Sequence, residues 1–461
     1  MPKPFPLDVP TLQGRFAPVT FEADAHDLPV LGRLPEGLFG TLYRNGPNPQ
    51  YAPAGAYHWF AGDGMLHAFH VERGRVSYRN RWLRTPKWQI EHDLGEALAR
   101  SDPRLATLDS TLANTNIVWH GGALLALEEQ HAPFAVDPRT LASLGTHDFA
   151  GVLRGPMTAH PKVDPRTGEL VFFGYSPTAP FSPDAHLGAV SASGRLTHKE
   201  TIALPFASMV HDFVVTERWL VLPVFPLRGS RERAASGGPA YAWEPALGSH
   251  VALVPRGGGV ADARWFVGDP CYVFHFANAF DGPRGTVVVD AMKSPAAPLF
   301  PLADGTIQSE TQSATLVRWT FDPRDSSGKG WCEEPLDDRP GEFPRFDERF
   351  TSLPYRHAYI RLDASLGHGA GIARVDIASR RVAEWRLDAG DTCDEPVFVP
   401  RSERAEEGDG WLLTVVYRHA ENRSDLAVLD ARDVAAGPVA LVQLAHRVPS
   451  GFHGNWRPGA L

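Results

Sequence analysis

The chain has 461 residues, among them 43 glycines and 41 prolines, and a formal net charge of −9. Because Gly and Pro spread this evenly do not fit inside long helices, the composition argues against coiled coils, helical bundles and helical solenoids. The acidic balance gives no overall attraction to phosphate polymers, so we expect no nucleic-acid partner.

The cysteines and the apolar segments indicate the compartment. Cys271, Cys332 and Cys393 lie too far apart for a disulfide framework or a thiolate metal site. The first ten residues show no apolar signal-peptide region, and no run of about 18 apolar residues occurs anywhere in the chain. We therefore expect a cytoplasmic protein without a transmembrane helix.

One stretch of the chain favours a helix. Residues 91–109 carry Leu94, Ala97 and Leu98 on one helical face, and we expect that helix to stop at Ser101-Asp102-Pro103. This stretch falls in the first of two predicted long loops, residues 86–112 and 228–262. Within the second, the Ser, Gly and Arg content of residues 229–239 predicts a mobile surface loop.

A short turn pattern recurs along the chain: an apolar residue, then Asp, then turn residues. Asp caps such a turn with its side chain, and the Pro or Gly that often follows presets the backbone. Apolar stretches flank the copies, which is typical of β-hairpins. The copies lie at residues 135–141, 162–170, 320–325, 361–367, 374–381 and 428–433.

Repeated hairpins over the whole length predict an all-β fold, and a β-propeller better than a sandwich. Seven blades would use about 66 residues each, more than compact propeller repeats of about 40–50 residues, so long loops are needed. We treat residues 1–461 as a single domain.

Four of the nineteen histidines lie in apolar surroundings, where a buried imidazole must be hydrogen-bonded or ligated. They are His160, His211, His275 and His453, separated by 51, 64 and 178 residues. The first two gaps are close to one blade and the third to three blades, so the rings can point at a common axis. Neutral imidazoles suit iron, copper, zinc or nickel, and the spacing alone does not choose among them.

Metal-bound histidines usually donate their second N–H to a carboxylate or a carbonyl. Three glutamates in apolar surroundings are candidates for this role: Glu129, Glu342 and Glu395. Glu128, next to the first of them, is an equal choice at that place. The alternative is that Glu342 and Glu395, each near a Pro, are turn residues.

Ten motifs in order make the chain similar to the carotenoid cleavage oxygenases, the non-haem iron enzymes that split alkene bonds. The motifs are YRNGP (43–47), FAGDGMLHAFHV (60–71), YRNRWLRT (78–85), ANTNIV (113–118), AHPKVD (159–164), MVHDFVVT (209–216), FHFANAF (274–280), EFPRFD (342–347), DEPVFVP (394–400) and GFHG (451–454). The resemblance implies a seven-bladed propeller with a cap of loops and short helices over the metal face. It implies Fe(2+) held by the four histidines named above, with the three glutamates as their acceptors and no catalytic residue beyond the metal centre.

The implied activity is oxidative cleavage of a C=C bond of a carotenoid or apocarotenoid by O2, which gives aldehyde or ketone products. The alternative is the same reaction on a stilbene or phenylpropanoid of the lignostilbene, resveratrol or isoeugenol type. Family members with those substrates carry a Lys before the first glutamate and a Tyr before the ANTN motif. This chain has Glu128 at the first position and no tyrosine in residues 91–113, so the carotenoid is preferred.

The substrate is expected to be hydrophobic and to need an apolar pocket. Candidates for its lining lie next to the motif histidines or in the FAGDGM motif. A propeller that binds a hydrophobic ligand without cleaving it is a third hypothesis. Peripheral contact with a membrane and the oligomeric state are left open. The pocket candidates are Trp59, Phe60, Glu128, Met209 and Phe274.

Overall fold

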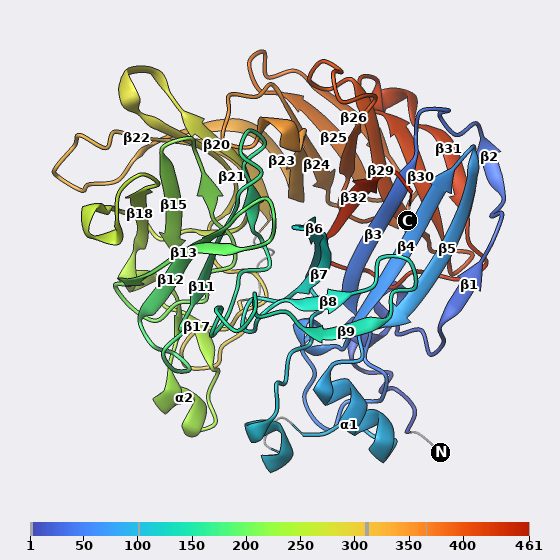
Figure 1. The fold of residues 1–461 in the computed structure, drawn as a ribbon, viewed down its shortest axis with the longest axis horizontal. Helices are drawn as coiled ribbons and strands as arrows, with labels where there is room; N and C mark the ends of the chain where they lie inside the picture. Colours follow the sequence, from blue (N-terminus) through green and yellow to red (C-terminus); the bar gives the residue numbers. More distant parts are fainter. Residues whose placement is uncertain (1–2, 100–101, 309–312, 366, 461) are drawn as a thin grey trace. The chain divides into compact units, whose positions relative to one another are not determined.

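The computed structural model describes residues 3–99, 102–308, 313–365 and 367–460, and most of its regular structure is β-strand (Figure 1). The chain divides into two compact units. Unit 1 comprises Met1–Gly151, Ala364–Ile372 and Ala383–Leu461, and unit 2 comprises Val152–Asp363 and Ala373–Val382. The description of the chain as one domain stays a prediction.

Antiparallel sheets make up unit 1. The first sheet has the order β1 (Ala23–Ala25), β5 (Arg75–Trp82), β4 (Gly64–Glu72), β3 (Gly40–Pro47), β32 (Gly454–Pro458). The second runs β6 (Asn116–His120), β7 (Ala123–Leu127), β8 (Phe134–Val136), β9 (Ser143–Thr146). The third runs β2 (Val30–Gly32), β31 (Pro438–Gln443), β30 (Arg423–Asp430), β29 (Gly410–Arg418), β27 (Thr392–Cys393), with β28 (Val397–Pro400) also on β29.

Strands from the two ends of the chain pair inside unit 1. The last strand, β32, lies antiparallel to β3, and β2 lies antiparallel to β31. A C-terminal strand that completes an N-terminal sheet leaves fewer unpaired sheet edges. This pairing also places His453, the residue before β32, at the end of a strand whose neighbour is buried along its whole length.

Unit 2 follows the same pattern of consecutive antiparallel strands. One sheet runs β10 (Lys162–Val163), β11 (Leu170–Tyr175), β12 (Asp184–Val190), β13 (Leu196–Ala203). Another runs β14 (Val214–Val215), β15 (Trp219–Val224), β18 (Ser249–Pro255), β19 (Arg264–Gly268). The largest sheet begins in this unit and runs β20 (Tyr272–Asp281), β21 (Val287–Ser294), β22 (Ala314–Phe321), β23 (Cys332–Phe346), β24 (His357–Leu362), β25 (Gly371–Asp376), β26 (Val382–Arg386).

The long strand β23 belongs to two four-stranded groups. Its first part, from Cys332 to Gly341, pairs with β22, and its last part, from Gly341 to Phe346, pairs with β24. The register shifts in both ladders, which marks the bend between the two parts. Divided there, and apart from one separate two-stranded sheet, the described strands fall into seven groups of four to six strands, the number of blades that the resemblance implies.

The recurring Asp turns are hairpin turns, as predicted. Asp137 accepts the backbone N–H of Thr140 between β8 and β9, and Asp322 accepts that of Arg324 between β22 and β23. Further copies are at Asp164, Asp376 and Asp430. Four of these five turns join the third and fourth strands of their group, so the pattern marks an equivalent place in different blades.

The helix prediction for residues 91–109 is wrong in its position. The helix α1 spans Pro86–Leu94, begins where the Thr85 side chain accepts the N–H of Trp88, and ends at Gly95 with φ of 74°. The Thr-Pro start signal and the Gly stop signal therefore outweigh the apolar spacing farther along. The predicted stop at Ser101 lies outside the described residues, and a short 3-10 helix follows at Pro103–Thr107.

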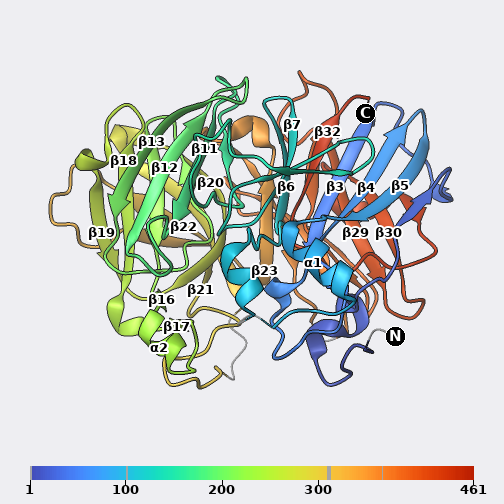
Figure 2. The same ribbon diagram turned by 60° about the horizontal axis from the view of Figure 1, so that its bottom comes forward.

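The loop predicted at residues 229–239 is an ordered hairpin. Its strands are β16 (Leu227–Gly229) and β17 (Tyr241–Trp243), with the short helix α2 (Arg231–Ala235) between them (Figure 2). Arg233 donates to the Glu244 carboxylate at 2.7 Å and to the Pro239 carbonyl at 2.7 Å. The arginine that suggested a solvated loop instead holds the hairpin together.

Neither α1 nor any other helix in the described ranges has the length and apolar character needed to cross a membrane.

A buried histidine gives the fold an expected acid sensitivity. The Nδ1 atom of His67 and the Tyr78 hydroxyl form a hydrogen bond of 2.7 Å. Burial lowers the pKa of His67 from 6.5 to about 3. Between these pH values the unfolded chain binds a proton here and the folded chain does not. The free energy of unfolding therefore falls by about 1.4 kcal/mol per pH unit of acidification from this group alone.

We expect His67→Gln to remove that slope, because glutamine keeps a hydrogen-bonding group for Tyr78 but does not titrate. Urea unfolding at several pH values between 6.5 and 4 measures it. His198→Gln is the control, since the His198 side chain is 52 % exposed. Equal pH slopes for wild type and His67→Gln would contradict the prediction.

Candidate metal centre

Three of the four predicted histidines converge within unit 2. His160 lies just before β10, His211 lies before β14, and His275 lies within β20. The Nε2 atoms of His160 and His211 are 3.1 Å apart, and those of His211 and His275 are 3.3 Å apart. All three ligand nitrogens lie within 4.8 Å of one another, and the rings of His160 and His275 are buried.

This spacing fits three ligands of one metal ion. Nitrogens bound to a common ion at about 2.1 Å, with angles of about 90–110°, are about 3.0–3.4 Å apart. Three neutral imidazoles with N–H on Nδ1 turn three Nε2 lone pairs toward one point, which is unfavourable unless a cation lies between them. The donor set is entirely imidazole and suits a transition metal.

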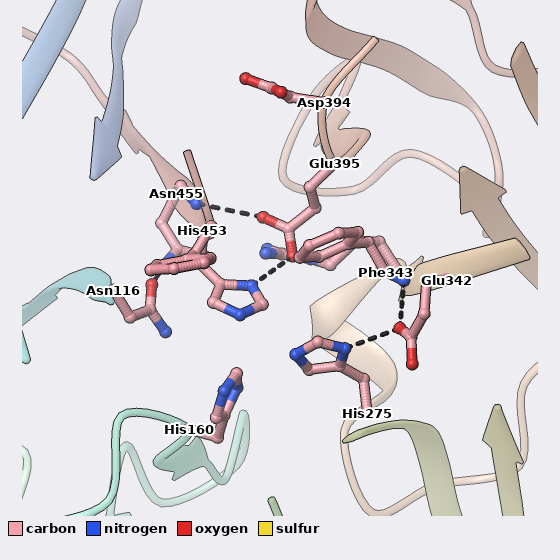
Figure 3. Close-up of polar contacts among 12 residues, drawn as sticks. Asn116, His160, His275, Glu342, Phe343, Asp394, Glu395, His453 and Asn455 are labelled. Atoms are coloured by element: carbon pink, nitrogen blue, oxygen red, sulfur yellow. Dashed lines mark hydrogen bonds and ion pairs between the residues drawn. The ribbon is translucent and has the colours of Figure 1, made fainter. Parts of the chain in front are cut away.

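Glu342 fixes the orientation of one of these rings. Its Oε2 accepts the Nδ1–H of His275 at 2.7 Å, which leaves the Nε2 lone pair for a metal (Figure 3). The same oxygen accepts the backbone N–H of Phe343 at 2.5 Å. Phe343 has φ of 55°, a conformation uncommon for an aromatic residue, and its ring stacks on His275 at 5.1 Å. The hydrogen bonds of Glu342 and the ring stacking thus maintain an uncommon backbone conformation that places an aromatic ring against the histidine.

His453 has an equivalent environment within unit 1. It is 4 % exposed, and its Nδ1 donates to Glu395 Oε1 at 2.9 Å (Figure 3). The other carboxylate oxygen accepts the Gly454 N–H at 3.0 Å and Arg44 Nη1 at 3.3 Å. The Arg44 side chain also pairs with Asp394 at 3.2 Å. A buried arginine therefore helps to hold the Glu395 carboxylate in place against the histidine.

The remaining acidic candidates lie in the turn after β7 in unit 1. Glu128 forms a short hydrogen bond with the ring of His131. Burial lowers the pKa of His131, but the hydrogen bond and the negative charges of Glu128 and Asp109 outweigh it and raise that pKa. Glu128 therefore has a basic partner, and its place beside a substrate stays a prediction. The role of Glu129 as an acceptor for a metal-bound histidine likewise stays a prediction.

Aromatic pocket candidates of unit 1 gather around Phe452, the residue before His453. The ring of Trp59 lies 5.0 Å from that of Phe16 and 4.5 Å from that of Phe452. Phe60 contacts Phe452 edge-on at 5.4 Å. Trp59 and Phe60 thus belong to one aromatic cluster, and their place beside a substrate stays a prediction.

In unit 2 the corresponding candidates are Phe274 and Met209. The Phe274 ring meets the His211 ring edge-on at 5.3 Å and the Tyr272 ring at 4.8 Å. Met209 is buried, and its backbone N–H donates to the Leu227 carbonyl at 3.1 Å. Phe274 is thus a direct neighbour of a candidate ligand, whereas Met209 anchors the segment that carries His211.

Sequence reasoning missed three charged residues near the histidines: Arg44, Lys162 and Asp212. Each lies inside one of the motifs that carry the family resemblance, and each is buried or mostly buried. An acid directly after a histidine in the apolar run MVHDFVVT was the available signal, since charged side chains are rarely buried without partners.

Glu342→Gln is expected to weaken metal binding about ten- to a hundredfold, because an amide is a poorer acceptor for the His275 N–H than a carboxylate. Competition with a chelator of known affinity measures the change. Glu348→Gln is the matched control, since Glu348 is 60 % exposed and pairs only locally with Arg345. Equal affinity of the Glu342 variant and the wild type would show that this hydrogen bond does not tune the site.

Comparison with known proteins agrees with this geometry. The family model described as retinal pigment epithelial membrane protein matches residues 16–458. The isoeugenol monooxygenase of Pseudomonas nitroreducens is 37 % identical over 97 % of this chain and 98 % of its own. The crystal structure of Pseudomonas brassicacearum lignostilbene dioxygenase has a TM-score of 0.94 and 37 % identity over 99 % of this chain and all of that chain. The cobalt-substituted apocarotenoid oxygenase of Synechocystis has a TM-score of 0.82 and 29 % identity over 96 % of this chain and 97 % of that chain.

Proposed function

The chain belongs to the carotenoid cleavage oxygenase family and has its all-β, seven-bladed propeller fold, and on this premise we propose that it cleaves a phenylpropanoid or stilbene alkene with O2. The observation that carries the proposal is the full-length identity of 37 % to both an isoeugenol monooxygenase and a lignostilbene dioxygenase. The apocarotenoid oxygenase is less similar, at 29 %. This reverses the preference for a carotenoid that two positions in the sequence suggested.

We propose that His160, His211 and His275 of unit 2, together with His453 of unit 1, hold Fe(II). The converging Nε2 atoms of the first three and the carboxylate partners of His275 and His453 support this ligand set. Four neutral ligands leave the ion its full charge. Bound Fe(II) would supply the redox chemistry that O2 needs to react with an alkene.

The protein's own side chains orient the proposed metal ligands and shield the substrate from water. One alkene and one O2 together contain all the atoms of two carbonyl products, so no side chain needs to gain or lose a proton overall. Glu342 and Glu395 hold their histidines in the tautomer that presents Nε2. Phe274 and the Trp59 cluster offer apolar surface for an aryl alkene and exclude water from it.

Recognition of a phenol would differ here from that in members with a lysine at this place. Glu128 is a hydrogen-bond acceptor, so it would receive the hydrogen of a substrate hydroxyl, while His131 holds the carboxylate in position. This role belongs to the proposal. The cytoplasmic location and the lack of a nucleic-acid partner remain predictions, and contact with a membrane is still open.

The test is aerobic incubation of the iron-loaded protein with isoeugenol, with a hydroxystilbene and with an apocarotenal, followed by mass spectrometry of the aldehydes. We expect an aryl aldehyde from one or both aryl alkenes and none without O2. Cleavage of the apocarotenal alone would restore the carotenoid reading. An iron-loaded protein that cleaves none of the three would overturn the enzyme assignment in favour of a binding protein.

A further inference from the structure

We infer that Asp212 is a positioning residue that aligns the three histidine-bearing segments of unit 2. The inference rests on the proposed function to the extent that these histidines bind a metal. It goes beyond it by assigning the alignment of the ligands to a side chain that is not one of the four histidines.

Both carboxylate oxygens of Asp212 receive hydrogen bonds from separate parts of the chain. Oδ1 accepts Lys162 Nζ at 2.7 Å and the Phe213 backbone N–H at 2.7 Å. Oδ2 accepts the Phe276 backbone N–H at 2.9 Å. One side chain thus joins residues 50 and 64 positions away along the sequence.

Each of these contacts lies beside a candidate metal ligand. Lys162 follows His160 by two residues, Asp212 follows His211 directly, and the Phe276 N–H follows His275 directly. The distances among the three Nε2 atoms therefore depend on segments that Asp212 ties together.

Backbone pairing between strands does not align the three histidine-bearing segments. The strands β10, β14 and β20 pair with β11, β15 and β21, each in its own sheet. Within the described residues, no ladder joins β10, β14 and β20 to one another, so side-chain contacts such as those of Asp212 contribute to their relative position. A carboxylate with short hydrogen bonds to three segments is well suited to that task.

The burial of Asp212 makes this alignment stiff. Its side chain is 2 % exposed, and that of Lys162 is 20 % exposed and lies 5.7 Å from the centre of the Phe213 ring. A charge removed from water is costly unless its partners stay in place. A shift of any one segment would therefore break a bond to a buried charge, which opposes the shift.

A second buried cation provides a matched comparison. Arg256 Nη1 donates to Asp164 Oδ2 at 3.0 Å and to the Thr216 carbonyl at 3.0 Å. It therefore joins the segments of His160 and His211, as Lys162 does, but four and five residues beyond those histidines. Its side chain is 14 % exposed, close to that of Lys162. Loss of Arg256 should lower stability without moving the ligands.

The experiment compares full-length, metal-free wild type with Asp212→Asn, Lys162→Met, Lys162→Arg and Arg256→Met. Co(II) is titrated into each, with calorimetry for affinity and visible absorption for the geometry of the ligand field. We expect Asp212→Asn and Lys162→Met to bind Co(II) about ten- to a hundredfold more weakly and to shift the absorption bands. Lys162→Arg should restore both, and Arg256→Met should keep both while its Tm falls.

Wild-type affinity and absorption bands in a folded Lys162→Met protein would overturn the inference, as would an equal loss in Arg256→Met. If Asp212→Asn does not fold, the comparison of Lys162→Met with Lys162→Arg and Arg256→Met decides. Wild type that binds no Co(II) would instead overturn the proposed metal centre itself. Wild type that binds Co(II) but cleaves no alkene when loaded with iron would overturn the proposed reaction and leave the alignment standing.

Discussion

Replacement of His211 by alanine is expected to remove the bound metal and to abolish alkene cleavage, while the β-rich fold remains. His211 is one of the proposed ligands, and its Nε2 lies 3.1 Å from that of His160 and 3.3 Å from that of His275. Loss of a proposed ligand should exceed the ten- to hundredfold loss of affinity that is typical when a hydrogen-bond partner of a metal-bound histidine is replaced. Elemental analysis after dialysis measures the metal, and circular dichroism measures the fold.

His198→Ala is the control for His211→Ala. His198 lies in β13, is half exposed and pairs with Glu200 at 3.8 Å, so its loss should leave the metal content unchanged. A folded His211→Ala protein with wild-type metal content would remove His211 from the ligand set and leave the other three histidines to be tested in the same way.

Arg44→Met is expected to destabilise the folded protein by about 3–5 kcal/mol. Arg44 is 2 % exposed, and its guanidinium pairs with Asp394 at 3.2 Å and with Glu395 at 3.3 Å. Without it, the Glu395 carboxylate would stay buried but lose its pairing with the guanidinium. Urea unfolding of the metal-free protein measures the free energy of unfolding without any contribution from a bound ion.

Arg33→Met provides the comparison for Arg44→Met. The Arg33 side chain is 83 % exposed and pairs with Glu36 on the surface, so its removal should change the free energy of unfolding by no more than about 1 kcal/mol. A loss in Arg44→Met as small as in Arg33→Met would mean that water or a rearranged partner replaces the buried arginine.

Local signals in the sequence were sufficient for the hairpins. An Asp side chain that accepts an N–H two or three residues ahead, as at Asp137 and Asp322, acts within a single turn. The same chemistry therefore works wherever the pattern occurs, and its recurrence predicted repeated blades. Local signals also determine α1, because the Thr85 cap and the Gly95 stop set its ends. Apolar spacing alone predicts a helix farther along the chain.

The class of substrate, unlike the hairpins, does not follow from a few local positions in the sequence. Two positions, Glu128 and the missing tyrosine, favoured a carotenoid, whereas similarity over the whole chain favours an aryl alkene. Substitutions at one end of a binding site can change how a substrate hydroxyl is held without changing the class of substrate. At the position where a lysine is expected in those relatives, this chain has Glu128, which forms a hydrogen bond with His131.

By itself, the sequence determined a turn-rich all-β chain and singled out four histidines by their apolar surroundings, because turn formation and burial depend on residues close together in the chain. Only the tertiary structure showed that three of those histidines converge, that β23 serves two groups of strands, and that Asp212 and Arg44 hold neighbouring segments. The partners of Asp212 are 50 and 64 residues away, and Glu395 is 351 residues from Arg44. Contacts over such separations depend on how the strands pack, and no local pattern of residues encodes them.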